Sequence, residues 1–126
     1  MTVLESALET YFNAQVRKRT GGKAIKLAPT QRGVPDRLVV MPPGELFLVE
    51  LKTTKGKLSE IQVFWHQQLA ALGVRVYTLH GKIDIDQWIT ARLNEVHERH
   101  VDDNELARLR RRRAELEQRA EERGRR

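Results

Sequence analysis

Cysteine is absent from this chain of 126 residues. Its absence excludes disulfide bonds, thiolate zinc sites and cysteine nucleophiles. Long hydrophobic runs are also missing: none approaches the roughly 20 residues that a membrane helix needs, and the N-terminus lacks the charged and apolar regions of a signal peptide. We therefore expect a soluble protein of a reducing compartment, the cytoplasm. A hydrophobic content of 40% is enough for one globular domain with a modest core.

Acidic residues are the minority among the charged side chains, with 17 Asp and Glu against 23 Lys and Arg and a formal charge of +6. The excess lies between Arg17 and Lys57, where ten basic residues accompany three acidic ones and the local charge is +7. A positive balance favours an anionic partner, although it says nothing about the fold. The segment is equally consistent with a nucleic-acid surface and with side chains that serve only solubility.

Periodicity and turn signals predict the order of the helices and strands. The expected helices cover 2–19, 59–72 and a segment that Asp84 can cap, and the expected strands lie near 23–27, 37–41, 46–52 and 74–79. The second helix begins at Ser59-x-x-Gln62, which has the form of a capping box. Each helix is expected to bury one apolar stripe: Leu4, Leu8, Tyr11, Phe12 and Val16 in the first, Ile61, Trp65, Leu69 and Leu72 in the second, and Ile85, Trp88, Ile89, Leu93 and Val96 in the third.

The connections between the strands predict the fold class. A Pro-Pro-Gly turn makes the strands at 37–41 and 46–52 antiparallel, whereas the strand–helix–strand unit from 46 to 79 predicts a parallel crossover. We therefore expect an α/β fold with a mixed four-stranded sheet flanked by helices, in the order αβββαβα.

The composition changes to Arg, Glu and Leu from Val101 onward, which separates an expected domain of residues 1–100 from a charged C-terminal helix of residues 101–126. Three leucines and an alanine could form the seam of a short coiled coil, and the run RLRRRR could bind phosphate. A solvated helix with Glu–Arg pairs is the favoured interpretation.

Three charged residues lie where the two hairpin strands would favour apolar ones: Asp36, Glu50 and Lys52. If Pro43 and Gly44 form the centre of the turn, Asp36 lies opposite Leu51, and a change of one residue in the loop puts it opposite Glu50 or Lys52. In each of these registers the three charged residues share one end of the hairpin. Strand alternation then places Glu50 and Lys52 on the same face.

Two carboxylates at the distance of a cross-strand pair repel each other, and this raises the pKa of one of them unless a cation lies between them. Mg²⁺ prefers oxygen ligands and usually takes only one or two protein carboxylates, which leaves positions for water and a substrate phosphate. A lysine beside that phosphate can stabilise developing negative charge. The cluster therefore favours phosphodiester hydrolysis, although Glu50-x-Lys52 alone would be an ordinary surface ion pair and Asp36 alone an ordinary turn residue.

The ordered motifs of this segment resemble the PD-(D/E)XK nuclease superfamily, and closely its VRR-NUC branch. The branch pattern GG…K…G-x-PDR…ELK…G-x-LS-x-x-Q is matched by Gly21-Gly22, Lys26, Gly33, Pro35-Asp36-Arg37, Glu50-Leu51-Lys52 and Leu58-Ser59…Gln62. The resemblance covers about residues 4–90 and implies a restriction-endonuclease-like core.

The resemblance also implies roles for individual residues. Asp36, Glu50 and the backbone carbonyl of Leu51 would hold Mg²⁺ or Mn²⁺, and Lys52 would be the catalytic lysine. A glutamate of the first helix would lie near the metal, with Glu5 at the better spacing and Glu9 as its competitor. Gln62 would lie at the edge of the site, although the capping box explains it equally well. Contacts to DNA phosphates are expected from basic side chains of the positive segment: Lys23, Lys26, Arg32, Arg37, Lys55 and Lys57.

Taken together, these features predict a metal-dependent endonuclease of a bacterial or phage-infected cell. The resemblance to VRR-NUC proteins that consist of this domain alone implies a homodimer that acts on branched DNA such as Holliday junctions. The alternatives are a nucleic-acid-binding module on a degenerate nuclease fold and an assembly protein that works through the C-terminal helix. Zinc at His97 and His100 lacks a third ligand, and no phosphate-binding loop for nucleotide hydrolysis is present.

Overall fold

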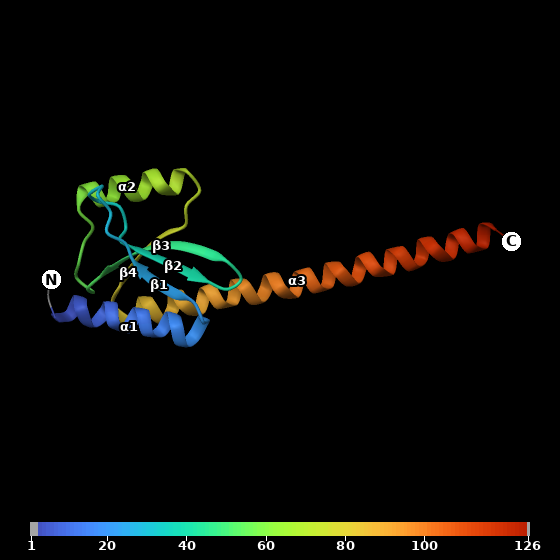
Figure 1. Cartoon of the computed structure of the whole chain (residues 1–126), viewed down its shortest axis with the longest axis horizontal. Coiled ribbons are helices and arrows are strands. Elements are labelled where there is room, and N and C mark those ends of the chain that lie inside the picture. The colour runs from blue at the N-terminus through green and yellow to red at the C-terminus, as the bar shows by residue number, and fades with distance from the viewer. Residues whose placement is uncertain (1–2, 126) are drawn as a thin grey trace. The chain divides into compact units, whose positions relative to one another are not determined.

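A computed structural model describes the backbone of residues 3–125 and the side chains of residues 5–99 and 102–125. Four strands and three helices follow one another in an order that confirms the predicted one (Figure 1). The elements are α1 (Val3–Thr20), β1 (Lys23–Lys26), β2 (Arg37–Met41), β3 (Glu45–Lys52), α2 (Glu60–Ala71), β4 (Val76–His80) and α3 (Gly81–Gly124).

The strands form one mixed sheet in the order β1-β2-β3-β4, which confirms the expected fold class. β1 pairs antiparallel with β2, β2 antiparallel with β3, and β3 parallel with β4. The hairpin between β2 and β3 pairs Met41 with Glu45 and Arg37 with Val49. This register differs by one residue from the one centred on Pro43 and Gly44, because the turn takes three residues, and its continuation puts Asp36 opposite Glu50.

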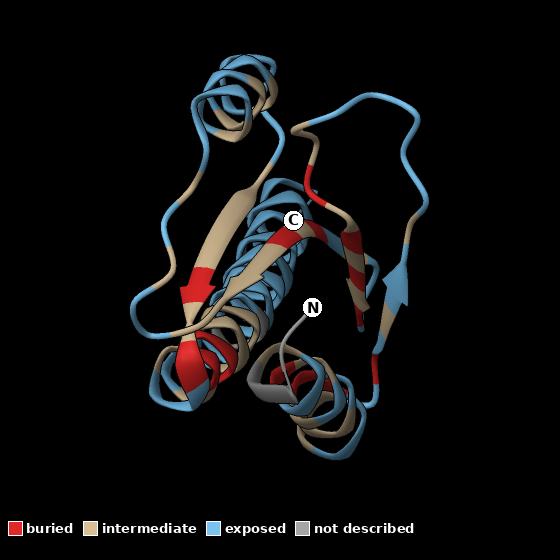
Figure 2. Ribbon diagram, turned by 90° about the vertical axis from the view of Figure 1, so that its left-hand side faces the viewer, coloured by how far each residue is buried: buried red, intermediate tan, exposed pale blue. Residues whose placement is uncertain are grey.

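The core lies on one face of the sheet, between the strands and the pair formed by α1 and the first turns of α3 (Figure 2). Alternate strand residues point toward this layer, and those at 37, 39 and 41 of β2 and at 47 and 49 of β3 are buried. Phe47 and Trp88 meet edge to face with ring centroids 5.3 Å apart. The predicted stripes of the first and third helices are confirmed at Leu8, Phe12, Val16, Ile85, Trp88 and Ile89, whereas the side chain of Leu4 lies outside the described residues.

The other face of the sheet carries α2, and here the predicted stripe is wrong. No residue of α2 is buried. Ile61 is 42% exposed, Trp65 and Leu69 are half-buried, and Leu72 beyond the helix is 81% exposed. Periodicity identified the apolar side of α2, but it could not show whether other parts of the chain pack against that side closely enough to bury it.

α3 begins three residues before the predicted cap, at Gly81. Asp84 therefore lies in its first turn, where its carboxylate accepts a hydrogen bond of 2.8 Å from the backbone N–H of His80. The chain divides into two compact units after Thr90. Within the second unit the side chains of residues 102–125 are all exposed, and Glu–Arg pairs such as Arg113–Glu117 at 3.0 Å lie along the helix. Among the described residues, no helix is long and apolar enough to cross a membrane.

Candidate active site

The open end of the β2–β3 hairpin brings together the charged residues that the sequence had singled out. Asp36 immediately precedes β2, while Glu50 and Lys52 lie at the end of β3. All three line a cavity of about 150 Å³. Its lining is completed by residues of α1 and of the two strands: Glu5, Leu8, Glu9, Arg37 and Leu51.

Glu50 occupies an environment that disfavours its charge. Burial and the neighbouring Asp36 carboxylate raise the pKa of Glu50 from 4.5 to about 7, against the opposing effects of Lys52, Gln62 and Arg37. The cluster therefore has a deficit of positive charge at its centre although it lies in a basic chain. A bound cation would remove this deficit.

Gln62 serves both of the roles that the sequence left open. Its backbone N–H donates to Ser59 Oγ at 3.3 Å and its side-chain Oε1 accepts from the Ser59 N–H at 2.9 Å, which completes the capping box at the start of α2. Its Nε2 donates to Glu50 Oε1 at 2.9 Å. The first turn of α2 is thereby tied to a carboxylate of the cluster.

A glycine keeps the loop before Asp36 close to that same turn. Gly33 has φ +91°, a conformation that other residues rarely adopt, and a Cβ at this position would lie 2.6 Å from the Ile61 carbonyl oxygen. Any side chain at position 33 would push the loop away from α2. This close approach gives a physical reason for a glycine three residues before Asp36.

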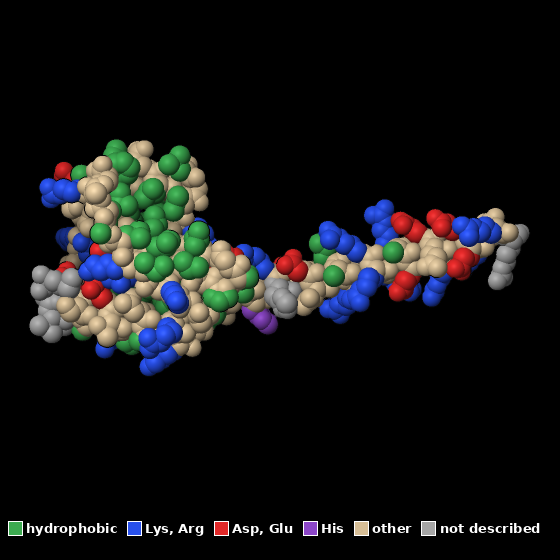
Figure 3. Space-filling view, viewed as in Figure 1, with side chains coloured by type: hydrophobic (Ala, Val, Ile, Leu, Met, Phe, Trp, Pro, Cys, Tyr) green, Lys and Arg blue, Asp and Glu red, His purple; other side chains and the backbone are tan. Residues whose placement is uncertain are grey.

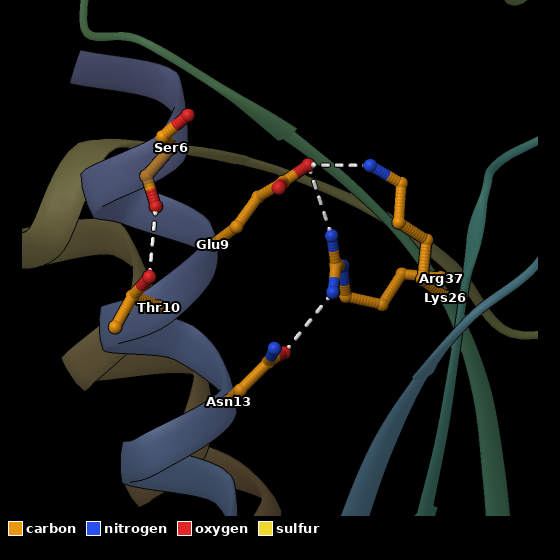
Figure 4. Close-up of polar contacts among 6 residues, drawn as sticks. All are labelled: Ser6, Glu9, Thr10, Asn13, Lys26 and Arg37. Carbon is orange, nitrogen blue, oxygen red and sulfur yellow. Dashed lines mark hydrogen bonds and ion pairs between the residues drawn. The ribbon is translucent and has the colours of Figure 1, made fainter. Parts of the chain in front are cut away.

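The two candidate glutamates of α1 differ in their surroundings, although both line the cavity. Glu9 Oε1 lies 3.0 Å from Arg37 Nη2 and 3.4 Å from Lys26 Nζ (Figure 4). Glu9 is thus neutralised by two cations. Glu5 lies one helical turn earlier on the same side of α1 and is half-buried.

The donor set fits a magnesium-type site more closely than a zinc site. Among the described residues no three His, Cys, Asp or Glu side chains gather to hold one ion. Two carboxylates that repel each other, together with main-chain oxygen, are ligands of the kind that Mg²⁺ and Mn²⁺ accept with water in the remaining positions. Asp36, Glu50 and the Leu51 carbonyl could supply such a set.

Five of the six residues predicted to contact DNA phosphates are exposed: Lys23, Lys26, Arg32, Lys55 and Lys57. Arg37 is a correction, because its side chain is only 3% exposed and points toward α1 (Figure 4). Its Nη1 donates to Asn13 Oδ1 at 3.1 Å in addition to the Glu9 contact. Arg37 was predicted to contact phosphate as one of the basic side chains of the positive segment, whereas strand alternation, which puts residue 37 on the same side as Val39 and Met41, was the signal for its burial.

His66 is a polar residue near the site to which the sequence gave no role. Its Nδ1 lies 3.5 Å from Thr78 Oγ1, and its Nε2 is buried without a hydrogen-bond partner in the described part of the chain. Burial and the nearby Lys52 lower the pKa of His66 below 6.5. The protonated imidazole is therefore disfavoured at this position, and no sequence motif pointed to it.

Comparisons with known proteins agree with this fold and this arrangement of side chains. The model of the VRR-NUC domain family matches residues 4–83. A protein of Acyrthosiphon pisum secondary endosymbiont phage 1, named "Putative nuclease p44", is 41% identical over 81 residues, which cover 64% of this chain and 86% of that protein. A solved structure described as a VRR_NUC domain superposes with a TM-score of 0.65 at 25% identity, and covers 71% of this chain and 97% of the other.

The match to the VRR-NUC model and the mixed sheet shared with a solved VRR_NUC domain define the chain as a nuclease domain. It belongs to the VRR-NUC family.

Proposed function

We propose that the chain is a Mg²⁺- or Mn²⁺-dependent endonuclease that hydrolyses phosphodiester bonds in DNA. The observation that carries this proposal is the juxtaposition of Asp36, Glu50 and Lys52 in one cavity. The charge deficit at Glu50 supports a cation at this position, and the phage relative supports an activity on nucleic acid.

Each residue of the cluster has a distinct task. Asp36, Glu50 and the Leu51 carbonyl would hold the metal ion, which when bound supplies positive charge and an acidified water. The Lys52 ammonium orients the attacking group and stabilises negative charge that develops on the phosphate. Gln62 Nε2 donates to Glu50 Oε1 at 2.9 Å and so holds the carboxylate in one orientation. Glu5 lies on the side of the cavity that α1 forms.

DNA would be held by the exposed basic side chains of the positive segment. Lys55 and Lys57 lie in the loop after β3. Lys23 and Lys26 lie on β1, and Arg32 lies in the loop before Asp36. Contacts of this kind neutralise phosphates without reading the sequence of bases. Selectivity for the structure of DNA, in particular for branched molecules such as Holliday junctions, would then depend on how two sites are spaced.

A homodimer would provide two sites. The described residues of one chain carry one such cluster, so a second copy would supply the site for cleavage of the opposed strand. Apolar side chains gather on the face of the first unit around α2 (Figure 3), where Phe64 is 52% exposed and Val63 40%. Pairing of two copies through this face would remove apolar surface from water.

The test is incubation of the purified protein with linear, flapped and four-way DNA in EDTA, Mg²⁺ or Mn²⁺. We expect cleavage only with metal, at the greatest rate on branched DNA, and none by Glu50→Gln. Binding of DNA without any cleavage would instead indicate a non-catalytic module. Light scattering of the parent and of Phe64→Glu tests the dimer, which the introduced charge should dissociate.

A further inference from the structure

Arg37 is a buried cation whose side-chain hydrogen bond and ion pair within the described residues both go to α1. Nη2 lies 3.0 Å from Glu9 Oε1 and Nη1 donates to Asn13 Oδ1 at 3.1 Å, while Nε is buried with no hydrogen-bond partner within the described residues (Figure 4). A buried guanidinium is costly unless it is paired, so its position is determined by the two α1 side chains that satisfy it. We call Glu9, Asn13 and Arg37 the α1 clamp.

The α1 clamp connects α1, which carries Glu5, to the start of β2, which follows Asp36. Arg37 is the residue after Asp36, so holding Arg37 in place also holds the backbone of Asp36 in place. Glu9 is one helical turn after Glu5, so fixing Glu9 also fixes the turn of α1 that carries Glu5. Both ends of the clamp line the cavity that contains Glu50.

Strand alternation explains why the clamp does not compete with the cluster. Residues 37, 39 and 41 are the buried set of β2, and the side chain of Arg37 in this set contacts α1. Asp36 is of the opposite parity and meets Glu50 across the hairpin. One residue therefore anchors the strand to the helix while its neighbour is presented to the site.

We propose that Arg37 is a positioning residue: through Glu9 and Asn13 it holds α1 against the start of β2, so that metal affinity depends on it although it touches neither metal nor DNA. This inference rests on the proposed function, because it takes the cluster as the metal site. Lysine cannot replace arginine here, because one ammonium cannot make the two divergent contacts of the guanidinium.

The test compares three variants for Mn²⁺ binding and for DNA binding separately. Arg37→Lys keeps the charge, and Asn13→Ala removes one neutral contact with little risk to folding. Lys26→Met is the matched control, because Lys26 contacts the same Glu9 oxygen at 3.4 Å but is 53% exposed. Free Mn²⁺ is followed by electron paramagnetic resonance without DNA, DNA affinity is measured in EDTA, and circular dichroism checks folding.

For Arg37→Lys we expect Mn²⁺ affinity to fall about tenfold or more, the range found for residues that orient metal ligands, with DNA affinity in EDTA unchanged. Asn13→Ala should show a smaller loss of Mn²⁺ affinity in the same direction, and Lys26→Met should weaken DNA binding alone. Unchanged Mn²⁺ affinity in Asn13→Ala and in a folded Arg37→Lys would overturn the inference. Weakened DNA binding by Arg37→Lys, like that of Lys26→Met, would also overturn it. A parent protein that neither binds Mn²⁺ nor cleaves DNA would refute the proposed function itself, and this inference with it.

Discussion

The two ends of the β2–β3 hairpin contain the same kinds of side chain in different electrostatic situations. At the closed end, Glu45 has a cationic partner, since Arg75 Nη1 lies 3.9 Å from its Oε2 and also stacks over Phe47 with Cζ 4.7 Å from the ring centroid. At the open end, Glu50 faces another carboxylate, and its pKa is raised to about 7 by burial and Asp36 although Lys52 is near.

This difference shows where the chain tolerates an arrangement that costs stability. The carboxylate at the closed end is neutralised within the chain, as expected for a residue that serves only the fold. At the open end the neighbouring cations do not offset the burial and mutual repulsion of the carboxylates, and a perturbed pKa of this kind is typical of a functional site. Variants at the open end should therefore alter metal response and catalysis, and Glu45→Gln at the closed end is the matched control for each of them.

The largest expected effect is that of Lys52→Ala. Cleavage should fall at least about a hundredfold, the cost of removing one group that stabilises charge in the transition state. DNA affinity should change little, because many other basic side chains carry it. Single-turnover cleavage and fluorescence anisotropy measure the two quantities, and turnover equal to that of the parent would remove Lys52 from the mechanism.

Asp36→Asn should abolish cleavage and uncouple stability from metal. In the parent, Mn²⁺ at ten times its Kd should add about 1.4 kcal/mol to the free energy of unfolding, because it binds only the folded chain. The variant loses a ligand and a repulsive charge together, so it should melt at or slightly above the metal-free parent and gain little from Mn²⁺. Calorimetry in EDTA and in millimolar Mn²⁺ measures this. An ordinary ion pair at Asp36 would give no metal response in either protein.

Glu50 should make the stability of the metal-free protein depend on pH. Its pKa is about 7 in the folded chain and near 4.5 when unfolded, so the folded state binds the proton more tightly between these values. The stabilisation is complete below about pH 4.5 and is lost as the pH rises to about 7. Glu50→Gln should flatten the pH dependence of the urea midpoint in EDTA, whereas Glu45→Gln should retain it. Equal slopes in all three proteins would show that Glu50 has no raised pKa.

Metal affinity should follow the same titration with the opposite sign. Below about pH 7 a proton competes with the metal for Glu50, so Mn²⁺ affinity should rise about tenfold per pH unit and level off above that value. Mn²⁺ titrations at several pH values measure this dependence. A pH-independent affinity would place the metal away from Glu50.

A moderate effect is expected from Lys55 and Lys57 next to the open end. If both contact phosphates, their replacement by alanine should reduce the slope of log K against log salt by up to about two, at roughly 0.9 per phosphate. Cleavage at saturating DNA should be unaffected. A parent protein with no salt dependence would mean that the basic segment is only a solvated surface.

The smallest effect is expected from removing residues 102–126. Their described side chains are all exposed, and the family match ends at residue 83. The melting temperature and metal-dependent cleavage should therefore change little. Loss of cleavage in this truncated protein would support a role of the C-terminal helix in assembly.

Local sequence patterns were sufficient to predict the order of the elements, the fold class and the residues of the cluster. Helix stripes, the capping box at Ser59 and the turn at 42–44 are local patterns, because each depends on neighbours within a few positions. The association of Asp36 with Glu50 and Lys52 also followed from the sequence, since a short hairpin brings them together in any of the three registers.

What those residues face depends on how the segments of the chain pack together. The packing gives the buried Arg37 a partner, Glu9 of α1, in place of a phosphate, and it leaves Ile61 and Leu72 exposed. Each of these results depends on distances between segments far apart in the chain. The pattern of one segment states which side of it is apolar or charged, but the packing of all segments determines what that side meets.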